Sequence, residues 1–245
     1  MAPTPTEAAQ PPAGPRLALQ SAAAGLGDVF AGPLFPMLLL CVATALAIGG
    51  AAVWAALTFI PPLIPAGTGW FSFADEAGAV LTGVAAVLLA LVLMAPVSIV
   101  TANILFDVVA ERVERTRLAP EPVGKGMAPL TGLSAGLKIA GLALALNVLA
   151  IPLYFVPVLN LAVFWCLNGF LMGREYFLLA ALRHRSWDEA QALRARYPLS
   201  VFAGGLACAV CLTVPVLNLA GALFAIATMA RLHRALAPAP DAVSA

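Results

Sequence analysis

Four long stretches without a charged residue constrain this sequence more than any other feature. They are residues 37–60, 77–106, 139–173 and 199–230. The first holds 24 residues, about 36 Å of helix at about 1.5 Å per residue, against roughly 30 Å for the hydrocarbon core of a bilayer. The chain is 62% hydrophobic, well above the roughly 45–50% of soluble domains. The sequence therefore predicts an all-α integral membrane protein whose partner is the lipid bilayer.

The two ends of the chain differ in composition from the part between them. Residues 1–15 are rich in Pro and Ala and nearly uncharged, and residues 237–245 are similar, so we expect a disordered leader and a disordered tail. No Lys or Arg precedes Arg16, and the first apolar stretch is too long for a secretory signal, so we expect no cleaved signal peptide. Residues 16–236 are then a single helical membrane domain.

The basic residues are distributed unevenly between the loops. Residues 61–76 contain no Lys or Arg, whereas residues 107–138 and 174–196 contain five each, and Arg231 and Arg234 follow the last apolar stretch. Because Lys and Arg accumulate on the cytoplasmic side, the 61–76 loop is predicted outside and both chain ends inside. The last two apolar stretches must then leave the cytoplasmic side and return to it. Each is predicted to be a helical hairpin.

The phrase VPVLNLA occurs in both predicted hairpins, at residues 156–162 and 214–220, which suggests a weak internal duplication. The returning arms, 161–173 and 219–230, hold 13 and 12 residues, roughly 20 Å of helix and too short for a full crossing. We therefore expect two long transmembrane helices plus two hairpins that penetrate the bilayer only partly. A full-span hairpin with its turn at the outer surface and a kink in one long helix are the alternatives.

Proline and asparagine give each hairpin tip a physical interpretation. Proline lacks an N–H and disfavours helix in the preceding residue, so Pro157 and Pro215 are predicted to end the ascending arms. Asn160 and Asn218 would cap the descending helices. Such tips require cover from protein or from a solvated cavity. With Asn168, these two asparagines could line a polar path, although helix capping and interhelical hydrogen bonds explain them more simply.

The stretch 77–106 continues into a charged segment that ends at Pro120, which predicts one long helix. Its polar residues recur at helical spacing in the stripe Asn103, Asp107, Glu111 and Glu114. Glu111 can pair with Arg115 one turn later. Most of the stripe is typical of a solvated face, but Asp107 lies at the apolar boundary and can pair with Arg174. Arg174 and Glu175 end an apolar run, a placement that favours an interhelical or intersubunit pair.

No arrangement of residues indicates catalysis or a cofactor. His184 and His233 are the only histidines and lie in basic stretches, where we expect interfacial residues. The four cysteines lie inside apolar stretches and are interpreted as small core residues: Cys41, Cys166, Cys208 and Cys211. A nucleotide-binding motif is absent, and the net charge of +1 does not suggest nucleic acid. We expect no enzyme activity, no metal and no cofactor.

Three segments together resemble the CysZ sulfate-permease family, which is related to the etoposide-induced membrane proteins of eukaryotes. They are APVSIVTANILFDVVAERVER (95–115), PVLNLAVFWCLNGFLMGREYF (157–177) and VPVLNLAGALFAIATMARLHR (214–234). The resemblance covers residues 16–236. It implies a helical protein of the bacterial inner membrane that forms a dimer or higher homo-oligomer and takes up sulfate for cysteine synthesis.

The resemblance also implies a sulfate site just before the first span, in a Gly-Leu-Arg-Arg type turn. Here the corresponding stretch is AGPLFP, residues 31–36. Gly32 matches, neither arginine is present, and Pro33 and Pro36 remove two amide donors. Two functions follow as hypotheses: a transporter or channel for a small inorganic anion such as sulfate, and a membrane scaffold or lipid-interacting protein that transports nothing.

Overall fold

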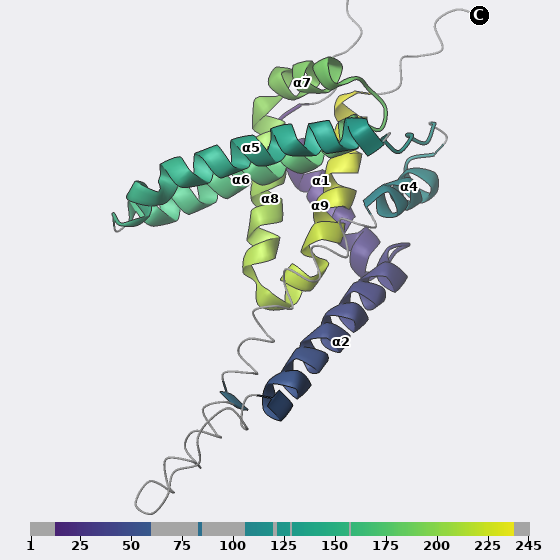
Figure 1. Cartoon of the computed structure of the whole chain (residues 1–245). Coiled ribbons are helices and arrows are strands. Elements are labelled where there is room, and N and C mark those ends of the chain that lie inside the picture. Colours follow the sequence, from purple (N-terminus) through teal and green to yellow (C-terminus); the bar gives the residue numbers. More distant parts are fainter. Residues whose placement is uncertain are drawn as a thin grey trace, which may run out of the picture.

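The computed structural model describes residues 13–59, 83–84, 106–119, 122–127, 129–156 and 158–237. Within these ranges the chain is helical and contains no strand, which confirms an all-α fold (Figure 1). The helices are α1 (Pro15–Phe30), α2 (Phe35–Phe59), α4 (Phe106–Arg117), α5 (Pro129–Tyr154), α6 (Leu159–Ala181), α7 (Trp187–Arg196), α8 (Pro198–Thr213) and α9 (Pro215–Leu236).

Two of the described helices are long and apolar enough to cross a membrane, over Phe35–Ala55 in α2 and Ser134–Tyr154 in α5. Most side chains in both segments face outward from the protein, as expected for helices that contact lipid. The first predicted span is thus confirmed as α2. Nearly all of the second, 77–106, lies outside the described residues.

The two hairpins differ in length. Helices α5 and α6 have 26 and 23 residues, about 39 and 34 Å at about 1.5 Å per residue, whereas α8 has only 16. Helix α6 exceeds the predicted short arm because Arg174 does not end it: the side chain is buried within the protein, and the helix continues to Ala181. How deeply either hairpin enters the bilayer stays a prediction.

The α8–α9 hairpin forms the centre of the molecule. Helix α1 packs against both of its arms, α6 crosses α8, and α4 lies beside α9. Helix α5 runs alongside α6 and extends with it away from this centre, while α2 projects in another direction (Figure 1). The molecule therefore combines a packed helical centre with two outlying parts that hold its longest apolar helices.

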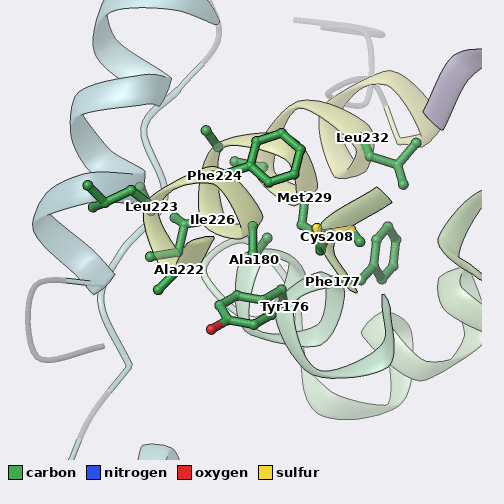
Figure 2. Packing of buried hydrophobic residues seen from close by; sticks show 14 of the residues in the cluster. Tyr176, Phe177, Ala180, Cys208, Ala222, Leu223, Phe224, Ile226, Met229 and Leu232 are labelled. Atoms are coloured by element: carbon green, nitrogen blue, oxygen red, sulfur yellow. The ribbon is translucent and has the colours of Figure 1, made fainter. Parts of the chain in front are cut away.

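The core is densest where α6, α8 and α9 meet. Figure 2 shows side chains of Phe177 from α6, Cys208 from α8, and Ile226 and Met229 from α9 gathered in one cluster, all fully buried. The crossing of α6 over α8 requires glycine, because a Cβ added at Gly205 would lie 2.0 Å from the carbonyl oxygen of Gly169. Small residues allow such close backbone approach between apolar helices.

The hairpin tips correct the predicted role of asparagine and extend that of proline. The ascending helix α8 ends at Thr213, with an extended Val214 directly before Pro215, as predicted. Pro215 is in addition the first residue of α9, and the N-cap of α9 is Val214, without a side-chain cap. Proline suits the first helical position, because its φ is already helical and its missing N–H would be unbonded there anyway. Helix α6 likewise has Val158 as its N-cap and no side-chain cap. Asn160 and Asn218 are therefore not N-caps, and Pro157 lies outside the described residues.

Candidate functional site

Buried charges tie α1, α4 and α9 together at one end of the central helices. Asp28, in the last turn of α1, is 2% exposed. It accepts hydrogen bonds from Nε and Nη2 of Arg231 at 2.7 and 2.9 Å, and Arg117 Nε lies 3.1 Å from its Oδ1. A bidentate arginine is the strongest arrangement for a buried carboxylate. The negative charge of Asp28 is therefore compensated within the protein.

A second cluster surrounds Glu114 of α4, which is 2% exposed. Its carboxylate accepts hydrogen bonds from Arg183 Nε at 3.1 Å and from the Gly124 amide at 2.9 Å, and His184 Nε2 lies 3.0 Å away. Burial by itself would raise the pKa of Glu114, but the hydrogen bonds from His184 and Arg183 and the charge of Arg183 lower it to about 2. Glu114 is therefore ionised throughout the physiological range.

The predicted pairing of Asp107 with Arg174 is wrong, because the partner of Asp107 is Arg183. Arg183 lies in the turn after α6, where it reaches both acidic residues of α4. Arg174 lies more than two helical turns earlier and faces α7 and α8. The predicted Glu111–Arg115 pair is confirmed at 2.7 Å, on the exposed face.

Glu114 was predicted to lie on a solvated face, and the structure places it in the interior. A signal for its burial is present in the sequence, since Phe106, Val109 and Val113 form the buried stripe of α4 and Glu114 adjoins it. The carboxylate that compensates Arg183 therefore lies on the same side of α4 as the core.

The rings of the two histidines, His184 and His233, stack on each other. The rings of His184 and His233 have centroids 5.3 Å apart, and Phe177 meets the His233 ring edge-on. His233 is 3% exposed, and its Nε2 has no hydrogen-bond partner in the described part of the chain. Burial, then the positive charges of His184 and nearby arginines, lower the pKa of His233 to about 3. His233 is therefore a neutral core residue, which corrects the interfacial interpretation.

Arg174 is a buried cation that belongs to neither of these two charge clusters. Its side chain is 7% exposed, and within the described part of the chain it makes no hydrogen bond or ion pair. It lines a cavity of about 200 Å³ together with Arg194 of α7 and the first residues of α8. Phe170 and Phe202 form the apolar part of the wall. The cavity thus presents two guanidinium groups in an otherwise apolar setting.

Glu175, the carboxylate next to Arg174 in sequence, is half-buried. The charge of Glu175 acts on Arg174 only through space. The predicted interhelical pairing of these two residues is therefore not present within the described chain, and the intersubunit alternative stays a prediction.

The predicted path residues do not converge on one site. Asn168 donates a hydrogen bond to the carbonyl of Phe164 in its own helix at 2.8 Å, and Asn160 is exposed at the α5–α6 tip. Asn218 lies at the other tip, where its Oδ1 is buried and no described residue donates to it. The two tips point in different directions (Figure 1). A path through all three asparagines is therefore not formed within one chain.

Gly32 lies against the end of α1. A Cβ added there would be 2.8 Å from the carbonyl oxygen of Asp28 and 3.1 Å from Arg117 Nη2. The amides of Leu34 and Phe35 donate to main-chain carbonyls, and Arg117 already pairs with Asp28. The amides of Leu34 and Phe35 and the guanidinium group of Arg117 are therefore already bonded to groups of the protein.

Comparison with known proteins places the chain in a family. Residues 21–221 match the family model described as sulfate transporter CysZ/etoposide-induced protein 2.4. No curated protein matches the chain. The match includes α2, both hairpin tips and every residue that lines the Arg174 cavity. Since it spans well over half of the sequence, the chain belongs to the CysZ/etoposide-induced protein 2.4 family of membrane proteins.

Proposed function

We propose that this protein is a transporter or channel of the bacterial inner membrane for a small inorganic anion. Sulfate taken up for cysteine biosynthesis is the proposed substrate and role. The protein would act as a homo-oligomer with both chain termini in the cytoplasm, and without catalysis. The family supports a transport role, and the unequal distribution of Lys and Arg supports the orientation.

The observation that carries the proposal is the unpaired, buried charge of Arg174. Burying a cation without a carboxylate costs several kcal/mol, of order 3–5 when a partner is removed from a buried pair. The chain compensates other buried ionic groups, such as Asp28 and Glu114, with partners of opposite sign. Arg174 has no hydrogen-bonded or ion-paired carboxylate among the described residues; the charge of Glu175 acts on it only through space, and Arg174 opens onto a cavity. A fixed positive charge of this kind attracts anions and repels cations.

Transport of labelled sulfate into proteoliposomes tests this function. We expect flux above that of empty vesicles, reduced about tenfold or more in Arg174→Gln, because a charge-assisted contact contributes roughly 1.5–3 kcal/mol. Arg174→Lys keeps the charge and should retain part of the flux. Arg112→Gln is the matched control, since Arg112 is exposed on α4 and should transport like the wild type.

A membrane scaffold or lipid-interacting protein is the second candidate. It is favoured by the turn at Gly32, which lacks the arginines of the resemblance and whose nearest cation is already paired with Asp28. The same reconstitution separates the two functions. Absence of sulfate flux from correctly folded, correctly inserted protein removes the transport proposal and leaves the scaffold.

A further inference from the structure

We propose that the cavity between α6, α7 and α8 is a binding site for a tetrahedral oxyanion group, sulfate or phosphate, held by Arg174 and Arg194. For free sulfate this deepens the proposed function and rests on it. The site is separate from the turn at Gly32, and none of the predicted path residues lines it.

Three positive features face this cavity from three helices. Arg174 comes from the middle of α6 and Arg194 from the last turn of α7. Helix α8 begins at Pro198, and the chain bends by 92° between α7 and α8. The N-terminus of α8 has no side-chain cap. The first amides of a helix have no acceptor within it, and they carry the positive end of the helix dipole. Pro198, Leu199 and Val201 of this first turn line the cavity. Pro198 has no N–H, and the amide of Val201 donates to the carbonyl of Tyr197 at 3.1 Å, so Leu199 is the lining residue of this turn whose amide remains for a ligand.

Arg174 supplies the independent reason to place a ligand here. It is more than nine-tenths buried, lines the cavity, and has no hydrogen bond or ion pair within the described ranges. The positive charge of Arg194 lies close enough to act on it unfavourably. Within the described residues, Arg194 donates to the amide oxygen of Gln191 at 3.0 Å and to no other group. Among the described residues, these two like charges beside a helix N-terminus therefore have no ion-paired carboxylate, and Glu175 acts on Arg174 only through space.

The charge and shape of the cavity select the class of ligand. A monovalent halide would neutralise one arginine and offers no geometry for a planar guanidinium fork. An oxyanion with several oxygens accepts paired hydrogen bonds from each arginine and leaves an oxygen for the α8 amides. At about 200 Å³ the cavity suits a small group, below the roughly 300–1,000 Å³ of sites for larger organic ligands.

Two sources can supply this chemistry, because Phe170 lines both this cavity and an apolar groove along α5 and α6. The groove has a volume of about 480 Å³ and no charged residue in its wall. A free sulfate ion would occupy the cavity alone. An anionic phospholipid would place its phosphate on the arginines and an acyl chain in the groove.

Equilibrium dialysis of labelled sulfate against the purified full-length protein in a neutral detergent, without added lipid, tests the free ion. We expect saturable binding, weakened about tenfold or more in Arg174→Gln and in Arg194→Gln. Phosphate should compete and chloride at equal ionic strength should not. Arg194 is only half-buried, so its variant keeps the test valid if Arg174→Gln fails to fold. Arg112→Gln should bind like the wild type.

Native mass spectrometry of protein from nanodiscs tests the lipid source. Phosphatidic acid in a phosphatidylcholine background should stay bound to the wild type and not to either arginine variant, and it should exclude sulfate. Such a result supports the oxyanion site with a lipid headgroup as its occupant. If neither sulfate nor phosphatidic acid binds in a way that depends on Arg174 and Arg194, the proposed site is wrong.

Binding and flux are measured separately, so the two proposals can fail separately. Arginine-dependent binding without sulfate flux keeps this site and removes transport. Sulfate flux that is normal in both arginine variants, with no arginine-dependent binding, removes this site and keeps transport.

Discussion

The phrase VPVLNLA has the same seven residues at 156–162 and 214–220, yet the chain breaks its helix at different points in the two copies. In the first copy α6 begins at Leu159, the fourth residue of the phrase. In the second copy α9 begins at Pro215, the second residue. The phrase specifies a turn, but its exact position depends on what surrounds it.

The surroundings of the two copies are opposite in character. At the first tip Phe155 is 82% exposed and Val158 88% exposed, and Val158 has a φ of 69°. Beyond the second tip the chain enters the core, with Ala220 buried and a Cβ at Gly221 placed 2.2 Å from Leu212 of α8. Local sequence sets the tendency to turn, and packing against α1, α6 and α8 sets where α9 starts.

The largest expected difference between the hairpins comes from adding volume at their helix interfaces. Gly205→Val should abolish monodisperse protein, because even a Cβ there would overlap the backbone of α6, and overpacking costs about 1–3 kcal/mol or more. Gly136→Val in α5 is the matched control, since nothing lies within 4 Å of its Cβ position. Size-exclusion chromatography and thermal unfolding in detergent measure both. Equal loss in the two variants would contradict the contrast between a packed and an open hairpin.

The two asparagines of the phrase provide a sharper comparison. Asn218→Leu should raise stability by about 1–3 kcal/mol, because its buried Oδ1 has no donor among the residues that the structure describes and the penalty of an unpaired buried oxygen would disappear. Asn160→Leu should change stability by less than about 0.5 kcal/mol, as for other exposed positions. Thermal unfolding measures both. A loss of stability in Asn218→Leu would mean that its amide has a partner in the assembled protein, and reduced flux at normal stability would favour a path role.

The dependence of stability on pH tests the burial of His233 in the second hairpin. The folded-state pKa of His233 is about 3, against 6.5 when exposed, so below pH 6.5 the unfolded state binds the extra proton. Stability should therefore fall on acidification, by about 1.4 kcal/mol at pH 5.5 relative to pH 7.5. His233→Phe should remove this part of the slope in unfolding measured across that range. An unchanged slope would show that other groups titrate there.

The smallest expected effect concerns the valine that precedes each descending helix. Val158→Gly should stabilise the first hairpin by about 1 kcal/mol, because L residues pay roughly this amount for a positive φ. Val214→Gly should destabilise the second by about 0.5–1 kcal/mol, since Val214 has an ordinary extended φ of −86° and glycine adds entropy to the unfolded chain. Opposite signs in thermal unfolding are the expected result, and equal signs would contradict the two conformations.

Local features of the fold were predictable because they depend on neighbouring residues. The apolar run of α2, the repeated turns and the Glu111–Arg115 pair all involve residues close in sequence, and the structure contains them. The site was less predictable. Arg174 was recognised as unusual from its position at the end of an apolar run, but its cavity partner Arg194 was not. Nothing in the spacing of α6 and α7 indicates that they converge with the start of α8.

The amino-acid sequence alone determined the membrane environment, the helical class and the places where the chain must turn, because hydrophobic length, proline and charge act over a few residues. Tertiary structure alone decided which charges are compensated. Asp107 and Glu114 contact Arg183 although 76 and 69 residues separate them from it in the sequence. Arg174 lines a cavity together with Arg194 of α7 and the first residues of α8. The energy of a buried charge depends on what packs around it, and that is fixed only when distant helices come together.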